Sequence, residues 1–552
     1  MLQRRKTSVV NIDTLSMGGE HPIRIQSMTN TSTLDTEGSI QQVVRIIEAG
    51  GELVRLTAQG VREAENLQAI RDGLHALGYH TPLVADIHFN PKAAEAAARI
   101  VEKVRINPGN FADPVKTFKT FEYTEEEYQQ EIDKIKERFI PFLNTCKEHR
   151  TAIRIGVNHG SLSDRIMSRY GDTPQGMVES CMEFLRICVA EHFPHVVISM
   201  KASNTFTMVQ TVRLLVKQMD QEDMHFPLHL GVTEAGDGED GRIKSAVGIG
   251  TLLLEGIGDT IRVSLSEDPE AEIPVARALV EHTIRRRQNA PAAGIAKIAL
   301  CKPTLAPHSA TPIVISDRSQ TTDISVDENL MPDYLYTKQS SFKPLSLNDI
   351  NEEALTDIRK HPETMLLLFS EDNNVYEQKA CIAALRQAEI TNRIVLWNTY
   401  DETDLATFQI KAATDCGSFF LDRWADGLML SNAHQQHPPQ AIDACSFGIL
   451  QATGRRISKT EYISCPSCGR TLFDLQTVIK KVKAATSHLK GLKIAIMGCI
   501  VNGPGEMADA DYGYVGAGIG KVSLYKGKQC VLKNIPEATA VDELMKIISN
   551  SQ

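Results

Sequence analysis

Three cysteines and one glutamate near the carboxyl end of the chain have types and spacing that suit a metal centre. Two residues separate Cys465 from Cys468, and thirty more lead to Cys499. The Asn-Gly-Pro-Gly turn after Cys499 can fold the chain back, so that Glu506 faces the same point. Soft thiolates with one weak oxygen ligand, and no second Cys-x2-Cys pair, favour a [4Fe–4S] cluster over zinc. A substrate can displace so weak a ligand, which would give Glu506 a catalytic role.

Five cations lie within apolar stretches of the kind that form buried strands. A single buried arginine would most simply belong to a structural ion pair, since such residues are rarely buried without a partner. Five on five strands of one barrel would instead converge on its mouth, and guanidinium groups bind phosphate oxygens in pairs. The sequence therefore predicts a small, strongly anionic ligand, a diphosphate, held by Arg55, Arg105, Arg154, Lys201 and Arg262.

Polar residues near the ends of the same stretches accompany these cations. Glu234 lies in the segment GVTEAGDG, where glycines leave room for a substrate. It is either a counter-ion for one arginine or a general acid beside the anion. The chain has no Walker loop, so an ordinary nucleotide site is not expected. The remaining polar candidates are Asp86, His88, Asn107, Asn158, His229 and Ser264.

Eight short β-rich segments, separated by amphipathic helical stretches, must position these residues. Eight such units in about 270 residues match a (β/α)8 barrel, whose active sites lie at the carboxyl ends of the strands. A doubly wound sheet is the alternative, but no glycine-rich dinucleotide loop follows the first segment. The expected strands are 22–28, 52–57, 82–87, 103–108, 152–158, 195–202, 227–234 and 259–266.

Composition narrows the class of protein. A chain of 552 residues predicts two to four domains, and a net charge of −10 argues against general nucleic-acid binding. No apolar run is long enough to span a membrane, and the amino-terminal residues resemble neither a signal nor a transit peptide. The 11 cysteines are mostly scattered singly, which suits a reducing compartment and predicts a cytoplasmic protein.

The ordered motifs QSMTNT, LVADIHF, RINPGN, LHLGVTEAG, CPSCGR and VNGPGE together resemble the 4-hydroxy-3-methylbut-2-enyl diphosphate synthase family of isoprenoid biosynthesis. The resemblance covers residues 1–290 and 456–552. It implies a TIM barrel followed by an α+β iron–sulfur domain similar to a repeat of sulfite and nitrite reductases. The implied reaction of the methylerythritol phosphate pathway converts 2-C-methyl-D-erythritol 2,4-cyclodiphosphate to the allylic diphosphate. Flavodoxin or ferredoxin is the implied donor of two electrons, delivered singly.

The same resemblance implies roles for individual residues. Cys465, Cys468, Cys499 and Glu506 would hold the [4Fe–4S] cluster, and the five strand cations would hold the diphosphate. The residues implied to surround the reacting carbons are Asn158, His229, Glu234, Ser264 and Asn502.

Residues 290–455 depart from the short form of this family, in which the barrel at 1–289 leads almost directly to the cluster domain at 456–552. Residues 290–345 are rich in Pro, Ser and Thr and predict an extended linker or covering strand. Residues 346–455 predict a structural α/β insert with strands within 364–370, 392–400 and 418–430, and with core cysteines Cys381, Cys416 and Cys445.

The insert also bears on how the cluster reaches the barrel. In the short form, the resemblance implies a dimer in which the cluster domain of one chain caps the barrel of the other. A rigid spacer of domain size predicts capping within one chain instead, whether the protein is a monomer or a homodimer.

Two other functions remain compatible with the motifs. One is a pterin-type barrel transferase with a structural metal site, which would be a colourless zinc protein. The other is an iron-sensing regulator, which would need a nucleic-acid surface that the acidic composition disfavours.

Overall fold

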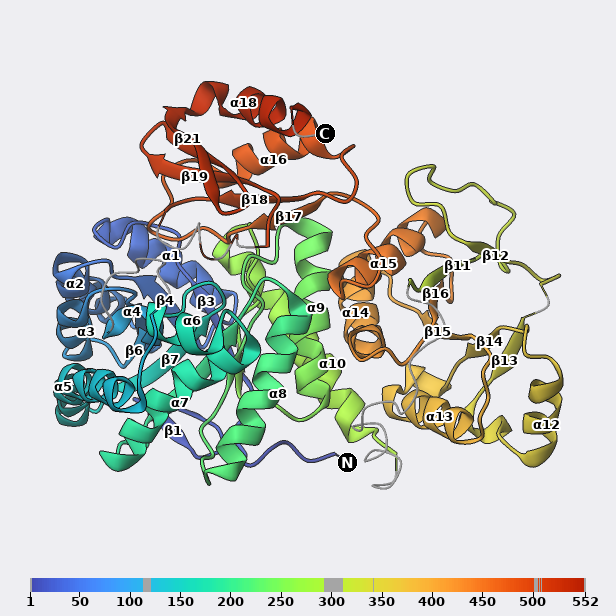
Figure 1. Cartoon of the computed structure of the whole chain (residues 1–552), viewed down its shortest axis with the longest axis horizontal. Helices are drawn as coiled ribbons and strands as arrows, with labels where there is room; N and C mark the ends of the chain where they lie inside the picture. The colour runs from blue at the N-terminus through green and yellow to red at the C-terminus, as the bar shows by residue number, and fades with distance from the viewer. Residues whose placement is uncertain are drawn as a thin grey trace.

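The computed structural model describes residues 2–112, 121–291, 311–340, 342–500, 505, 507 and 509–550. These residues form a barrel, an insert beside it, and a smaller domain over one end of the barrel (Figure 1). Among them, no helix has both the length and the apolar character needed to cross a membrane.

Eight parallel strands form the barrel, in the order β8-β7-β6-β5-β4-β3-β10-β9. An isolated parallel bridge between Ile198 and Leu228 joins the two ends, so the ring is nearly closed. Every strand falls within a predicted segment, which confirms the TIM barrel. The strands are β3 (Arg24–Met28), β4 (Leu53–Thr57), β5 (Leu83–Asp86), β6 (Lys103–Ile106), β7 (Ala152–Asn158), β8 (Val196–Lys201), β9 (His229–Leu230) and β10 (Thr260–Ile261).

Helices surround the strands, and side-chain caps define where several of them begin. Asn90 and Asn204 each accept a backbone N–H at the start of a helix, and Pro91 occupies a first-turn position where no N–H is needed. The longer barrel helices are α1 (Thr36–Glu48), α2 (Val61–Ala76), α3 (Pro91–Ala98), α5 (Glu125–His149), α7 (Pro174–Ala190), α8 (Thr205–Gln221), α9 (Gly238–Leu254) and α10 (Glu272–Gln288).

A two-stranded hairpin of β1 (Val10–Ile12) and β2 (Leu15–Met17) closes the amino-terminal end of the barrel. Its Val10, Ile12 and Met17 are fully buried and pack with the lowest inward-facing strand residues, such as Leu53 and Val197. The barrel therefore has an apolar floor, and its polar inward residues lie above that floor, toward the carboxyl ends of the strands.

The insert contains one parallel sheet in the order β12-β11-β16-β15-β14-β13. Three of its strands come from the stretch expected to be a linker, so the sheet begins at Ile313. The run IVISD carries β-branched residues whose strand preference outweighs the surrounding linker-like composition. The strands are β11 (Ile313–Asp317), β12 (Tyr334–Tyr336), β13 (Lys343–Leu345), β14 (Leu366–Leu368), β15 (Ile394–Tyr400) and β16 (Gly427–Asn432).

In the described part of the insert, four α-helices accompany this sheet: α12 (Glu352–Lys360), α13 (Val375–Gln387), α14 (Leu405–Leu421) and α15 (Pro439–Ala452). The strand expected within 418–430 begins only at Gly427, because residues 418–421 complete α14. A short apolar run alone does not distinguish a buried helix end from a strand. The expectation for the insert cysteines is confirmed, since Cys381, Cys416 and Cys445 are fully buried and free.

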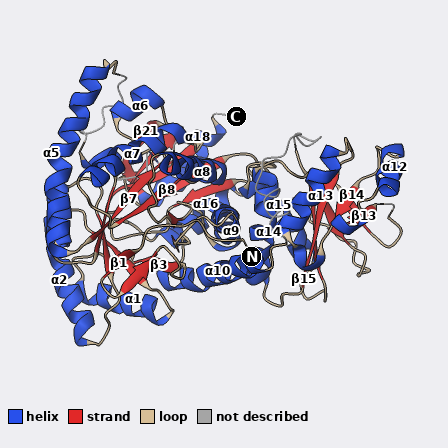
Figure 2. Ribbon diagram, turned by 90° about the horizontal axis from the view of Figure 1, so that it is seen from below, coloured by secondary structure: helices blue, strands red, loops and turns tan. Residues whose placement is uncertain are grey.

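The insert packs against the barrel through α14, which lies along α9 and α10 (Figure 2). Glycines permit the close approach of α9 and α14. A Cβ atom added at Gly250 would lie 2.9 Å from Cγ2 of Thr414, and one added at Gly417 would lie 3.1 Å from Cα of Val247. The two helices therefore pack with almost no side-chain layer between their backbones at these points.

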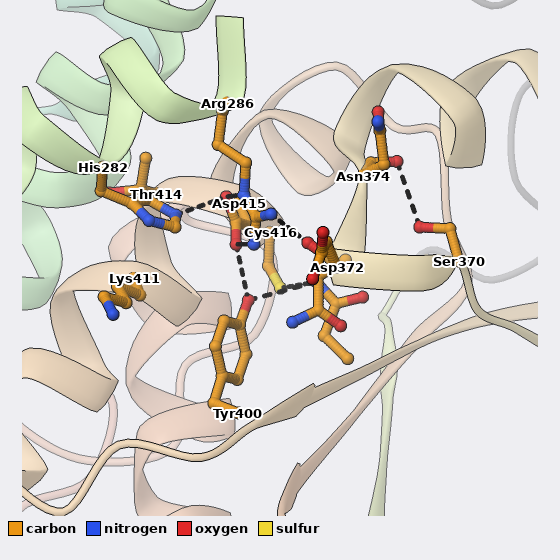
Figure 3. A network of polar contacts seen from close by, with 12 residues as sticks. His282, Arg286, Ser370, Asp372, Asn374, Tyr400, Lys411, Thr414, Asp415 and Cys416 are labelled. Carbon is orange, nitrogen blue, oxygen red and sulfur yellow. Dashed lines mark hydrogen bonds and ion pairs between the residues drawn. The ribbon is translucent and has the colours of Figure 1, made fainter. Parts of the chain in front are cut away.

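A buried carboxylate joins the insert to α10 (Figure 3). Asp415 of α14 contacts Nε2 of His282 at 2.8 Å and accepts from Nε and Nη2 of Arg286 at 3.0 and 2.7 Å. The hydroxyl of Tyr400 donates to the same carboxylate at 3.0 Å. Burial alone would raise the pKa of Asp415, but His282 and Arg286 hold it well below its ordinary value. The carboxylate is therefore charged and fully paired.

Replacing Asp415 with asparagine should loosen the insert from the barrel, because it leaves the Arg286 guanidinium buried without its counter-charge. Removing one partner of a buried ion pair typically costs about 3–5 kcal/mol. We expect a lower thermal midpoint and faster hydrogen exchange in α14. Asp357→Asn is the matched control, since that aspartate pairs with Lys343 on the surface of the insert and should change neither measurement. Unchanged exchange in Asp415→Asn would contradict this role for the network.

The carboxyl-terminal domain has a five-stranded sheet in the order β17-β18-β19-β20-β21, with its first three strands parallel. Because β17 and β18 are parallel neighbours, their carboxyl ends place Cys465 and Cys499 at the same edge of the sheet. The elements are β17 (Glu461–Ser464), α16 (Leu475–Thr486), β18 (Lys493–Met497), β19 (Tyr512–Gly518), β20 (Lys521–Lys526), β21 (Gln529–Pro536) and α18 (Glu537–Ser549).

Candidate active site

The carboxyl-terminal domain lies over the mouth of the barrel of its own chain (Figure 1). Ser464, the last residue of β17, forms a parallel bridge with Ala235 of the barrel. The hydroxyl of Ser266 lies 3.0 Å from the Ser464 hydroxyl and donates to the carbonyl of Cys465 at 3.0 Å. The segment that leads into the first cysteine is therefore bonded directly to two barrel loops.

Ion pairs and close backbone contacts hold the same junction. Lys483 pairs with Asp237 at 2.5 Å, and Lys244 of α9 pairs with Glu461 of β17 at 3.1 Å. At Gly469 an added Cβ atom would lie 2.5 Å from the carbonyl oxygen of Thr31 in the barrel. A larger residue at this glycine would therefore push the two domains apart.

One cavity lies at this junction, and both domains line it. The barrel contributes Met28, Arg55, Asp86, His88, Arg105, Arg154, Asn158, Ser199, Lys201, Thr233, Glu234, Arg262 and Ser264. The carboxyl-terminal domain contributes Cys465, Pro466, Ser467, Cys468, Arg470, Thr471, Met497, Gly498 and Cys499. Five of these residues are arginines, a sixth is Lys201, and two are carboxylates, so basic side chains outnumber acidic ones in the cavity. Such an environment suits a ligand that carries several negative charges.

Asp86 is the main counter-ion within the lining. Its Oδ1 accepts from Nη1 of Arg105 at 3.1 Å, and its Oδ2 accepts from Nη2 of Arg470 at 3.3 Å. Burial alone would raise the pKa of Asp86, but the charges of Arg55 and Arg105 hold it well below its ordinary value. A charged Asp86 thus links an arginine of the barrel to an arginine of the domain above.

His88 is held in its neutral form beside the same carboxylate. Burial lowers the pKa of His88 to about 3, and the charges of Arg105 and Arg470 act in the same direction. Nη1 of Arg105 lies 2.5 Å from Nε2 of His88. Because arginine only donates, Nε2 must accept and the proton must sit on Nδ1. His88 therefore orients Arg105 rather than adding a charge to the site.

Arg262 is held by a carboxylate that the sequence analysis did not single out. Glu272, at the start of α10, accepts from Nε and Nη2 of Arg262 at 2.9 and 2.8 Å. It also accepts from the Ser27 hydroxyl at 2.7 Å. Glu272 is fully buried and lies behind the arginine, outside the cavity lining. The pairing fixes the orientation of the Arg262 guanidinium at the cavity wall.

Below the mouth, several buried donors have no hydrogen-bond partner among the described residues. They include Nε and Nη1 of Arg154, Nε2 of His229 and Nζ of Lys103. Burial, followed by the charges of Arg154 and Arg55, holds the pKa of Lys103 well below its ordinary value. Burial and the charges of Arg154 and Lys201 do the same for His229. His229 lies beneath the cavity lining rather than in it, so its predicted contact with a ligand stays a prediction.

Glu234 projects into the cavity from a strained loop. Its φ of 47° lies in the left-handed region, which is uncommon for a residue other than glycine. Such a conformation costs of the order of 1–3 kcal/mol and is found mostly where the surrounding structure enforces it at functional sites. Glu234 is buried beside Arg262 and Ser264 in the same lining. The backbone strain and the position both favour a functional role.

The three cysteines lie together at the roof of this cavity. The Gly498 amide donates to Sγ of Cys465 at 3.2 Å, and the Cys468 amide is held by the Thr471 hydroxyl at 3.0 Å. Burial raises the pKa of the Cys465 thiol. No three His, Cys, Asp or Glu side chains within the described ranges are placed to bind a single metal ion. Cysteine thiolates are the ligands that iron–sulfur clusters take, so three thiols around one cavity are compatible with such a cluster.

The structure thus brings most of the predicted site residues to one cavity. Those in its lining are Arg55, Asp86, His88, Arg105, Arg154, Asn158, Lys201, Glu234, Arg262, Ser264, Cys465, Cys468 and Cys499. Asn502 and Glu506 lie outside the described residues, so their roles stay predictions. Arg470 and Glu272 were missed. The adjacency of Arg470 to the cysteine pair was an available signal, whereas Glu272 begins an ordinary helix and offered none.

Comparison with known proteins identifies the family. Residues 7–277 match the GcpE TIM-barrel domain, and residues 461–550 match the GcpE protein C-terminal domain. The chain is 57% identical to the 4-hydroxy-3-methylbut-2-en-1-yl diphosphate synthase (flavodoxin) of Parabacteroides distasonis, over 99% of this chain and 98% of that protein. This chain belongs to the 4-hydroxy-3-methylbut-2-en-1-yl diphosphate synthase family.

Other members of this family with the same printed name are also similar along their whole length. The protein of Bacteroides thetaiotaomicron is 54% identical, over 100% of this chain and 98% of its own length. That of Porphyromonas gingivalis is 51% identical, over 100% of this chain and 98% of its own length. The alignments therefore include the insert, which the two family domains leave unmatched. Membership in this family supports the predicted reductive enzyme of isoprenoid biosynthesis and does not support the pterin-type transferase.

Proposed function

We propose that this chain is a 4-hydroxy-3-methylbut-2-en-1-yl diphosphate synthase of isoprenoid biosynthesis, which reduces 2-C-methyl-D-erythritol 2,4-cyclodiphosphate. The observation that carries the proposal is one cavity lined by a ring of cations below and by three cysteines above. The cations suit the diphosphate. The cysteines suit a [4Fe–4S] cluster, held by Cys465, Cys468 and Cys499 with Glu506 as the proposed fourth ligand.

The overall reaction consumes two electrons and two protons. The carbon–oxygen bond that closes the cyclic diphosphate breaks, one hydroxyl leaves as water, and a carbon–carbon double bond forms. A bound cluster would supply the electrons one at a time. The protein supplies the binding of the diphosphate, the orientation of the reacting carbons and a proton for the departing hydroxyl.

The chemical type of each residue suggests which of these roles it has. Arg55, Arg105, Arg154, Lys201 and Arg262 hold the diphosphate. Asn158, Ser264 and Asn502 line the carbon skeleton, and His229 supports it from beneath the lining. Glu234 is buried in the lining near Arg262 and Ser264, where a carboxyl group can reach the bound substrate. We assign it the delivery of the proton to the leaving hydroxyl. The carboxyl-terminal domain covers the reacting groups at the mouth of the barrel.

Flavodoxin is the proposed electron donor, because the relatives named above carry it in their names. A cytoplasmic location is proposed with it, since all the cysteines among the described residues are free thiols. Capping is proposed to occur within one chain, whatever the oligomeric state, because the Ser464–Ala235 bridge and the Lys483–Asp237 ion pair hold the carboxyl-terminal domain on its own barrel.

An anaerobic assay tests the proposed function. Protein purified without oxygen should contain about four iron atoms per chain, as a [4Fe–4S] cluster requires. It should then convert the cyclodiphosphate to the allylic diphosphate when reduced flavodoxin is supplied, and ferredoxin in a parallel reaction tests the choice of donor. A colourless zinc protein without turnover would contradict the proposal and would favour the transferase alternative.

Replacing Arg55 with lysine should weaken substrate binding even though the charge is kept. A lysine is a point charge and does not make the paired hydrogen bonds of a guanidinium. Loss of one charged hydrogen bond costs on the order of 1.5–3 kcal/mol. We expect a higher Kd for the cyclodiphosphate in calorimetry, with Arg62→Lys on the exposed face of α2 as the matched control. Wild-type affinity in Arg55→Lys would argue against its contact with the diphosphate.

A further inference from the structure

Arg470 is the one permanent cation that the described part of the carboxyl-terminal domain brings into the cavity. It follows the Cys-x2-Cys pair by two residues and is almost fully buried. A buried arginine requires a partner, and Arg470 finds one across the junction in Asp86 of the barrel, at 3.3 Å. The residue is therefore built into the contact between the two domains rather than into the carboxyl-terminal domain alone.

The position of Arg470 also places a fixed charge beside the cysteines. Arg470 follows Cys468 by two residues and lines the same cavity as Cys468, Cys499 and Asp86. Arg470 and Asp86 are buried, and Cys468 and Cys499 are half-buried. Arginine keeps its proton at every physiological pH, so this positive charge is permanent. In a partly dry site such a charge acts more strongly than on a surface.

A permanent positive charge beside a redox centre favours the form that carries more negative charge. Reduction of an iron–sulfur cluster adds one electron, and cluster potentials depend on nearby charge and on hydrogen bonds to sulfur. Arg470 should favour the reduced form, whereas the carboxylate of Asp86 should oppose it. The ion pair across the junction therefore joins two groups with opposite effects on the same potential.

We propose that Arg470 is a positioning residue that ties the cysteine loop to Asp86 and raises the reduction potential of the cluster through its fixed charge. The proposal rests on the proposed function, because it takes the cluster held by Cys465, Cys468 and Cys499 as present. It gives Asp86 a second role, since this carboxylate then sets the potential as well as the orientation of Arg105.

The test is a redox titration of the anaerobically purified holoprotein, followed by electron paramagnetic resonance. Arg470→Gln should shift the midpoint potential to more negative values. Arg470→Lys should recover most of the wild-type potential, because it keeps the charge. Asp86→Asn should shift the potential in the opposite direction, to more positive values. Lys480→Gln is the matched control, since it removes one exposed charge from α16 and should leave the potential unchanged.

The outcomes separate this proposal from its alternatives. A wild-type potential in Arg470→Gln, or an equal shift in the glutamine and lysine variants, would overturn the role of the charge. If Arg470→Gln fails to assemble a cluster, the midpoint potential of Asp86→Asn provides the test. An unchanged potential in that variant would likewise overturn the proposal. Wild-type protein that assembles no cluster would instead refute the proposed function.

Discussion

Cys499→Ser should lose its cluster iron and its turnover together. A serine oxygen is a poor ligand for the iron of such a cluster, and a centre held by three thiolates has no spare soft ligand. Cys499 follows β18 at the edge of the sheet where β17 delivers Cys465, so no other described cysteine is placed to replace it. We expect near-background conversion of the cyclodiphosphate, with iron content measured on the same anaerobic sample.

Cys530→Ser is the matched control for this prediction. Cys530 lies on β21, is half-buried and is absent from the cavity lining. Cys530→Ser should keep both its iron and its turnover. If the loss of any thiol were harmful, iron and turnover would fall in Cys530→Ser as well as in Cys499→Ser. Full iron content and full turnover in Cys499→Ser would disprove the ligand assignment.

Glu234→Gln should bind the cyclodiphosphate nearly as well as the wild type and turn it over slowly. A carboxylate among phosphate oxygens adds little to substrate affinity. The strained backbone of Glu234 is therefore better explained by a role in the chemical step. Loss of a general acid typically reduces the rate by ~10²–10⁴-fold. Steady-state kinetics should therefore show a lower kcat with a KM close to wild type.

Glu281→Gln, on the exposed face of α10, is the matched control and should change neither constant. If Glu234 is only a counter-ion, the opposite changes in kcat and KM are expected. If the carboxylate only balances an arginine, the glutamine variant would alter KM and leave kcat at saturation unchanged.

The barrel and its cations could both be predicted from the sequence, because the cationic site residues lie within the apolar runs that form the strands. Arg55, Arg105 and Arg154 interrupt apolar runs that are otherwise typical of buried strands, so the residues that define the strands also reveal the site. The inward direction of the side chains then follows from the period of two along a strand. The cysteines were found by spacing, and β17 and β18 place them as that spacing requires.

What could not be predicted depends on contacts between distant segments. Glu272 matters because the start of α10 passes behind Arg262, which no local pattern records. Asp415 looks like an ordinary helix residue until α14 meets α10. The first strands of the insert were not predicted because their segment has the composition of a linker. In the structure β11 pairs with β12 and β16 within the sheet. In each case tertiary packing overrides the local signal.

The central claim is that one chain supplies both the cationic mouth and the cluster to a single cavity. Mixing Cys499→Ser with Glu234→Gln, each inactive for a different reason, tests it most directly. If each chain caps its own barrel, no chain in the mixture has both parts intact, and turnover should stay at the level of the separate variants. Recovery of turnover in the mixture would show that the cluster domain of one chain serves the barrel of another, and would contradict the account.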